Sequence, residues 1–140
     1  MVRGAAQVVV AQDYVLAARL RGERAWRVIA DISAHEVETN PAGGPVDSNP
    51  FGLLAQAGAR VVADAGANAL LRVAASGEVS TLAVLPRPLG GPAGTVDPVP
   101  TSVVMGPDGA YYVGLLTGFP FAANASTVYK VLPCAVPGVF

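Results

Sequence analysis

The stretch DSNPFGLLAQAGARVVADAGANALLRV, from Asp47 to Val73, decides the fold of this chain. A polar cluster precedes its first apolar run, and a second polar cluster with Gly and Asn separates the next two runs. Short runs rich in Val, Leu and Ala that end at turn residues are typical of β-strands. The stretch therefore predicts strands joined by tight turns. It also raises the question of whether its two polar clusters are two loops or one site.

The middle of the chain contains four such apolar runs in succession. The expected strands are Phe51 to Ala55, Arg60 to Asp64, Ala69 to Val73 and Val79 to Leu85. All the connections have hairpin length and contain Gly, which adopts the positive φ angles that tight hairpins require. This part of the chain predicts an antiparallel four-stranded meander.

The same plan recurs after Pro100. The expected strands there are Thr101 to Met105, Ala110 to Gly114 and Thr127 to Val131. An insertion that contains TGFPFAANA separates the second and third of them. Four antiparallel strands that recur at about 50 residues are typical of a β-propeller blade. We therefore expect an all-β chain of antiparallel four-stranded propeller blades.

The length of 140 residues predicts an incomplete propeller, because a ring has about four to eight blades of ~40–50 residues each. Residues 1–46 are expected to hold a partial blade and a connector, and residues 47–92 a complete blade. Residues 93–140 are expected to hold a partial blade with an inserted loop and without an outer strand, because PCAVPGVF is a poor strand pattern. Such a chain is either a fragment or one that closes a ring with copies of itself.

The N-terminal part fits the end of a preceding blade. Its expected strands are Gln7 to Ala11, Tyr14 to Ala18 and Trp26 to Ile32. The sequence SAHE then has the spelling of a capping box, with Ser33 as the N-cap and Glu36 reaching back. It predicts one or two helical turns through Thr39.

The composition limits the classes of partner. Hydrophobic residues make up 52% of the chain and charged residues 14%, but Pro, Gly or a charged residue interrupts every apolar run before the ~20 residues that a membrane span needs. The net charge is −1 and the basic residues are scattered, so we expect no nucleic-acid partner. The N-terminal apolar patch is too short for a secretory signal. The single cysteine, Cys134, is expected to be a small buried hydrophobe.

Five segments together resemble the ScyD/ScyE family, bacterial proteins that are named after members in scytonemin-biosynthesis clusters and are related to NHL-type propellers. The segments are DSNPFGLLA, ARVVADAGANALLRV, GEVSTLAVLP, VPTSVVMGPDGAYYVGLLTGFPF and VYKV. The resemblance implies a propeller of about six or seven blades that is mostly exported, and hence an extracellular or periplasmic location. It implies no particular biochemical role.

The order of strands places the two polar clusters together. In a meander, the connector that enters the first strand and the turn between the second and third strands lie at the same end of the sheet. We therefore expect Asp47, Asn49, Asp64 and Asn68 to gather at one face and to form a ligand site. Asp97 and the inserted TGFPF loop are expected at the same face.

Carboxylate and amide oxygens suit Ca²⁺, which takes about six to eight oxygen ligands, so Asn49 and Asp64 are metal candidates. The chain is also more distantly similar to regucalcin-like lactonases and other propeller hydrolases, which hold a channel metal, and that similarity extends only to Asn49. The alternative interpretation is structural. In it, Asp47 and Asn49 make Asx-turns, while Asp64 and Asn68 satisfy backbone N–H groups of the turn.

Two aromatic residues and one histidine complete the candidates. Phe119 and Phe121 on the inserted loop either fold over the channel mouth or meet a partner as ligand-binding residues, or they pack back onto the blade. His35 lies in a sequence close to a zinc-protease helix, but Thr39 occupies the position of the second histidine. We therefore expect His35 to be structural.

The sequence favours a binding or scaffold module that takes a small molecule, a glycan or a protein at this face. The alternative is part of a metal-dependent hydrolase or lactonase whose other ligands lie in missing blades. A third interpretation is a truncated chain without a function of its own, or one that self-associates through its open blade edges.

Overall fold

The structure is a computed structural model that describes residues 28–87, 96–133 and 138–139. The elements in chain order are α2 (Ile32–Thr39), β1 (Pro50–Gln56), β2 (Ala59–Asp64), β3 (Ala69–Ala74), β4 (Val79–Val84), β5 (Pro100–Met105), β6 (Tyr111–Leu115), β7 (Val128–Val131) and β8 (Gly138–Val139). The described chain is therefore mostly β-structure, as predicted. Cys134 and the strands expected at Gln7 to Ala11 and Tyr14 to Ala18 lie outside the described residues.

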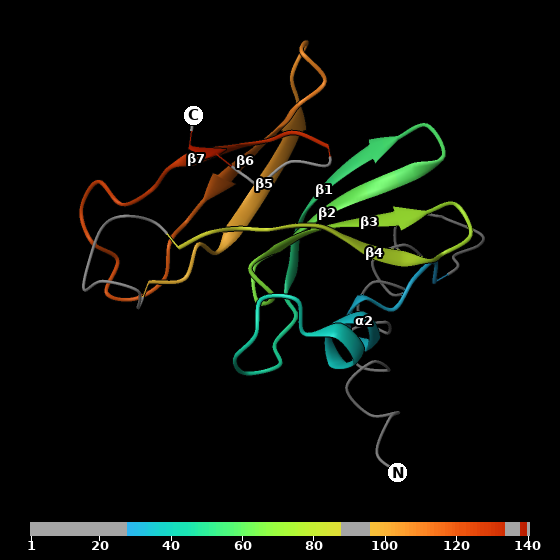
Figure 1. Ribbon diagram of the computed structural model, residues 1–140, viewed down its shortest axis with the longest axis horizontal. Helices are drawn as coiled ribbons and strands as arrows, with labels where there is room; N and C mark the ends of the chain where they lie inside the picture. The colour runs from blue at the N-terminus through green and yellow to red at the C-terminus, as the bar shows by residue number, and fades with distance from the viewer. Residues whose placement is uncertain (1–27, 88–95, 134–137, 140) are drawn as a thin grey trace, which may run out of the picture.

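The strands form two antiparallel sheets, a first sheet in the order β1-β2-β3-β4 and a second sheet in the order β5-β6-β7-β8 (Figure 1). Strands that follow one another in the sequence are neighbours in each sheet, so the predicted meanders are confirmed. Gly58 and Gly109 lie in the first hairpin of each sheet at φ 72° and 77°, a conformation that Gly adopts without strain.

The two sheets repeat the same local geometry. The register shifts directly after the first residue of each sheet, Pro50 in β1 and Pro100 in β5. Pro50 lies opposite Asp64, and Pro100 lies opposite Leu115. Asp64 and Leu115 therefore occupy equivalent positions at the ends of β2 and β6.

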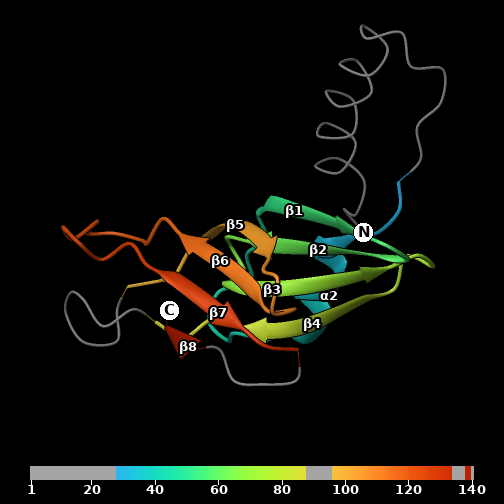
Figure 2. The same cartoon turned by 90° about the horizontal axis from the view of Figure 1, so that it is seen from above.

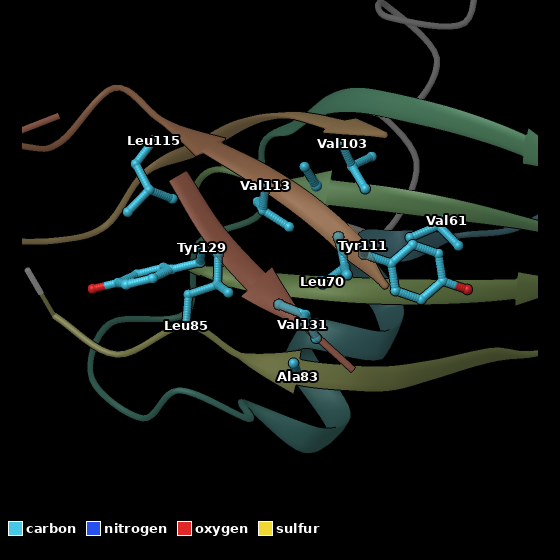
Figure 3. Close-up of a cluster of buried hydrophobic side chains, with 11 residues drawn as sticks. Val61, Leu70, Ala83, Leu85, Val103, Tyr111, Val113, Leu115, Tyr129 and Val131 are labelled. Carbon is cyan, nitrogen blue, oxygen red and sulfur yellow. The ribbon is translucent and has the colours of Figure 1, made fainter. Parts of the chain in front are cut away.

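An apolar core joins the two sheets, which overlap in the view of Figure 2. Figure 3 shows its buried side chains, which are Val61, Ala63, Leu70, Ala83, Leu85, Val103, Tyr111, Val113, Leu115, Tyr129 and Val131. The first strands of the two sheets, β1 and β5, approach closely at Gly52, where a Cβ atom would lie 2.8 Å from the Thr101 oxygen. Only glycine fits there, because such a distance is shorter than any ordinary contact.

The helix α2 helps to cover the other face of the first sheet. Ile32 packs against the buried residues of β2 and β3 on that face, and His35 Nε2 lies 3.0 Å from Thr81 Oγ1 on β4. This hydrogen bond fits the structural role predicted for His35. Within the described ranges, no helix is long and apolar enough to cross a membrane.

The start of α2 differs from the prediction. Asp31 is the N-cap and accepts a hydrogen bond from the Ala34 N–H at 2.9 Å, so the assignment of Ser33 as the N-cap is wrong. Asp is as good an N-cap residue as Ser. With Asp31 in that position, the helix begins at Ile32. Glu36 does not reach back to the helix start but is buried at 3% exposure. The predicted strand Trp26 to Ile32 is also wrong where it is described, because residues 28–31 form no strand and Ile32 belongs to the helix.

The end of the chain also differs from the prediction. The second sheet was expected to lack an outer strand, but β8 pairs with Tyr129 and Lys130 of β7. This strand has only two residues. Its pairing uses backbone groups, which every residue except proline offers in full, and so a poor apolar pattern did not reveal it.

Candidate functional site

The two polar clusters of the opening stretch meet at the carboxylate of Asp64. The Ser48 hydroxyl donates a hydrogen bond to Asp64 Oδ2 at 2.8 Å. The backbone N–H of Asn49 donates to Asp64 Oδ1 at 2.7 Å. The connector that enters β1 and the turn that leaves β2 therefore lie together, as the strand order predicted.

The same carboxylate also closes the turn between β2 and β3. The backbone N–H groups of Gly66 and Ala67 each lie 3.1 Å from Asp64 Oδ1, and Asp64 is fully buried. Among the described residues, three backbone donors approach Oδ1 and the Ser48 hydroxyl approaches Oδ2. These contacts match the structural interpretation of Asp64 and give no support to its role as a metal ligand.

Asn68 connects the same turn to the second sheet. Its backbone has a positive φ of 52°, which Asn tolerates better than most residues. Its side-chain Oδ1 accepts a hydrogen bond from the Val99 N–H at 3.0 Å, and its Nδ2 donates to the Gly66 oxygen at 3.4 Å. Asn68 therefore fixes the entry to β5 relative to the first sheet.

Asp47 and Asn49 lie against the turn but are exposed. A Cβ atom on Gly66 would lie 3.0 Å from Asp47 Cγ and 2.9 Å from the Asn49 nitrogen. The connector thus passes directly over the turn, and only glycine permits this approach.

A cavity of about 360 Å³, called the hollow below, lies beside this turn. It is lined by Glu36, residues 42–45, Asp47, residues 66–68, residues 84–87 and residues 97–98. Asp47, Asn68 and Asp97 belong to the lining, whereas Asn49 and Asp64 do not. The connector and the turn thus meet as predicted, but only some of the predicted residues line the hollow.

Sequence reasoning missed Glu36 as part of this site. Burial raises the pKa of the Glu36 carboxyl above its ordinary value of 4.5, and the charges of Asp64 and Asp47 raise it further, while His35 lowers it. No hydrogen bond or ion pair joins its carboxylate to another residue in the described part of the chain. The sequence did contain a signal for the burial of Glu36. It follows Ile32, which packs on the sheet, by four residues, and residues four apart lie on the same side of a helix.

The rim of the hollow carries an ion pair that leads to the inserted loop. Arg87 and Asp97 lie 3.5 Å apart, and more than half of each side chain is exposed. The Gly118 N–H donates a hydrogen bond to the Asp97 backbone oxygen at 2.9 Å. This bond fastens the inserted loop to the segment that leads into β5.

The two phenylalanines of the inserted loop are exposed, Phe119 by 80% and Phe121 by 65%. Their rings pack edge to face on each other, with centroids 6.2 Å apart and an angle of 85° between the planes. They do not pack back onto the sheet, so that alternative is wrong. The loop offers an exposed aromatic surface.

The structure does not assemble a metal centre from the described residues. No group of three or more His, Cys, Asp or Glu side chains within residues 28–87, 96–133 and 138–139 is placed to hold a metal ion. The role of Asn49 as a calcium ligand stays a prediction. Comparisons with family models, curated proteins and solved structures gave no match for this chain.

Proposed function

We propose that this chain is a binding module built from propeller blades, and that a small molecule, a glycan or a segment of a protein enters the hollow. The support for blades is the repetition of one meander with the same register shift after Pro50 and Pro100. The contact of the inner strands at Gly52 and Thr101 is the arrangement expected near a propeller axis. In this proposal the protein acts outside the cytoplasm, as the resemblance to the ScyD/ScyE family implies.

The observation that carries the proposal is the hollow itself. Its volume of about 360 Å³ falls within the range of about 300–1,000 Å³ that is common for small-molecule sites. Its lining combines apolar residues such as Leu85 and Pro98 with the polar groups of Asp47 and Asn68. A few polar groups in an apolar wall are typical of sites that fix the orientation of a ligand.

Binding is favoured over catalysis by the position of the histidine. His35 is the only histidine in the chain, and its ring is hydrogen-bonded to Thr81 outside the lining of the hollow. General acid or base chemistry in the hollow would therefore depend on carboxyl groups alone.

The proposal includes association with further blades. Phe51 and Leu53 alternate along β1 and are 67% and 64% exposed. A neighbouring blade, supplied by a longer chain or by a second copy, would cover these side chains. Measurement of the solution mass separates a monomer from an assembled ring.

The binding function is tested by blocking the hollow. Ala42 lines the hollow and is exposed, so Ala42→Trp fills the space without disturbing the core. Ala57 is equally exposed in the β1–β2 turn at the opposite end of the sheet, and Ala57→Trp is the matched control. A library of glycans and small molecules is then screened by thermal shift. We expect ligands that stabilise the wild type and Ala57→Trp but not Ala42→Trp, whereas ligands that stabilise all three equally argue against the hollow.

A further inference from the structure

We propose that the hollow binds an organic cation, an alkylammonium or guanidinium group, with the Glu36 carboxylate as its counter-ion. This inference rests on the proposed binding function and names the ligand class of the same site.

The first support is the state of Glu36. The residue is 3% exposed and lines the hollow, yet its carboxylate has no hydrogen bond or ion pair to any residue within the described ranges. Its carboxylate oxygens are not among the fully enclosed unpaired atoms of the described residues, so they are open to the hollow that Glu36 lines. A positively charged donor in the hollow supplies the missing partner.

The second support is the charge of the lining. Glu36, Asp47 and Asp97 contribute carboxylates, against the single guanidinium of Arg87. That guanidinium lies 3.5 Å from Asp97 at the exposed rim. The buried Asp64 carboxylate behind the turn adds to the negative potential at Glu36. Attraction between charges is stronger in a partly buried site than in water, so the hollow favours a cation over an anion or a neutral group.

The third support distinguishes an organic cation from a metal ion. Ca²⁺ takes about six to eight oxygen ligands, whereas no three metal-binding side chains converge among the residues described. The lining instead contains Pro45, Leu85 and Pro98. Apolar walls beside a carboxylate suit a charged head on a hydrocarbon stem, since such groups bury the stem and pair the head.

The experiment uses the full chain and three probes of similar length. Pentylammonium and butylguanidinium carry the proposed head group, and 1-pentanol is the neutral control. Binding is followed by NMR titration or calorimetry. We expect saturable binding of both cations by the wild type, and no binding of pentanol. A further arm with a lysine-containing peptide distinguishes a cation on a protein partner from a free amine.

Two glutamates on the same helix provide the matched variants. Glu36→Gln removes the charge within the hollow, while Glu38→Gln removes an exposed charge outside it. Loss of a charge-assisted hydrogen bond is expected to weaken cation binding about tenfold or more in Glu36→Gln. Glu38→Gln should bind like the wild type. Asp47→Asn, at an exposed position, gives a second variant that keeps the fold and is expected to weaken binding by a smaller factor.

Several outcomes overturn the inference. Equal affinity of the wild type and Glu36→Gln for the amines would do so, as would equal binding of pentanol or no binding of any cation. If the cations fail but another ligand from the screen is blocked by Ala42→Trp, the hollow is a binding site of a different class. If no ligand is affected by Ala42→Trp, the proposed function fails as well.

Discussion

The side chain of Asn68 holds the backbone of Val99, since its Oδ1 accepts a hydrogen bond from the Val99 N–H at 3.0 Å. The bond crosses from the turn of the first sheet to the residue before β5. It links two segments that are 31 positions apart in the chain. The relative placement of the two sheets thus depends in part on one amide side chain.

We predict that replacement of Asn68 separates two contributions to stability. Asn68→Gly removes the hydrogen bond but keeps a backbone that adopts φ 52° freely, and it should cost about 1–3 kcal/mol. Asn68→Ala should cost about 1 kcal/mol more, because the left-handed conformation strains an L-residue with a Cβ. Denaturant unfolding of both variants measures the difference. Equal stability of the two variants would mean that the strain is no larger than the extra chain entropy that glycine loses on folding.

The turn held by Asp64 should depend strongly on its carboxylate. Asp64→Ala leaves the backbone donors of Asn49, Gly66 and Ala67 without their acceptor, and it should cost at least about 3 kcal/mol. Ser48→Ala removes one of the four bonds and should cost about 1 kcal/mol. Thermal melts with calcium or with EDTA should agree for the wild type. A melting temperature that falls only in EDTA would instead support the metal role predicted for Asn49 and Asp64.

The stability of the chain should depend on pH through Glu36. Its pKa is raised in the folded chain, so the folded state holds this proton more tightly than the unfolded state. Stability therefore falls as the pH rises above about 4.5 and through the raised pKa. The charges of Asp64 and Asp47 favour the protonated form of Glu36, and His35 opposes it. Arg87 and Asp97 also line the hollow.

Glu36→Gln removes this dependence, because its amide stays neutral. The variant should melt at about the wild-type temperature near pH 4 and about 2–5 °C higher near pH 7. Thermal melts across this range, with Glu38→Gln as the control, measure the effect. A lower melting temperature for Glu36→Gln near pH 7 would mean that the carboxylate is stabilised by a partner.

A surface cluster on the second sheet should titrate at low pH. Asp108 lies 2.7 Å from Lys130 Nζ, and this contact together with bonds from Ala110 and Tyr112 lowers the Asp108 pKa to about 2. The folded state then holds this proton less tightly, so stability is lost as the pH falls from about 4 towards 2. NMR titration of Asp108 should give a midpoint near 2. Lys130→Met should raise that midpoint, and an unchanged midpoint would contradict the assigned cause.

The exposed aromatic pair should matter little for folding. Phe119→Ser and Phe121→Ser remove side chains that are mostly in solvent, so each should change stability by less than about 0.5 kcal/mol. Tyr129→Ser, at 2% exposure, is the contrasting core variant and should cost several times more. A large loss of stability in the loop variants would show that the rings support the fold.

The sequence predicted the strands well because their signals are local. Glycines at positions 58 and 109 mark hairpins, and the apolar runs between turns are short and regular. The closeness of Asp47 and Asp64 also followed from strand order alone. These features need no knowledge of distant contacts.

The features that the sequence did not reveal depend on tertiary contacts. Glu36 fits the pattern of a capping box as well as it fits a buried position, and only the packing of α2 on the sheet decides between them. The inserted loop that carries Phe119 is tied to Asp97, a residue more than 20 positions earlier in the chain. Neither relationship can be read from residues that adjoin in the chain.

The equivalent positions of Asp64 and Leu115 have a consequence for how the chain tolerates change. In the first sheet, a side chain holds the short turn, and four groups rely on its chemistry. Both sheets have a backbone bond at this point, from Ala65 to Asn49 in the first sheet and from Leu116 to Val99 in the second. In the second sheet, further backbone bonds from Thr117 and Gly118 to the segment before β5 take the place of the aspartate. Backbone bonds survive most substitutions. The longer loop is therefore free to acquire new residues and new specificity, while the shorter turn is constrained to keep its aspartate.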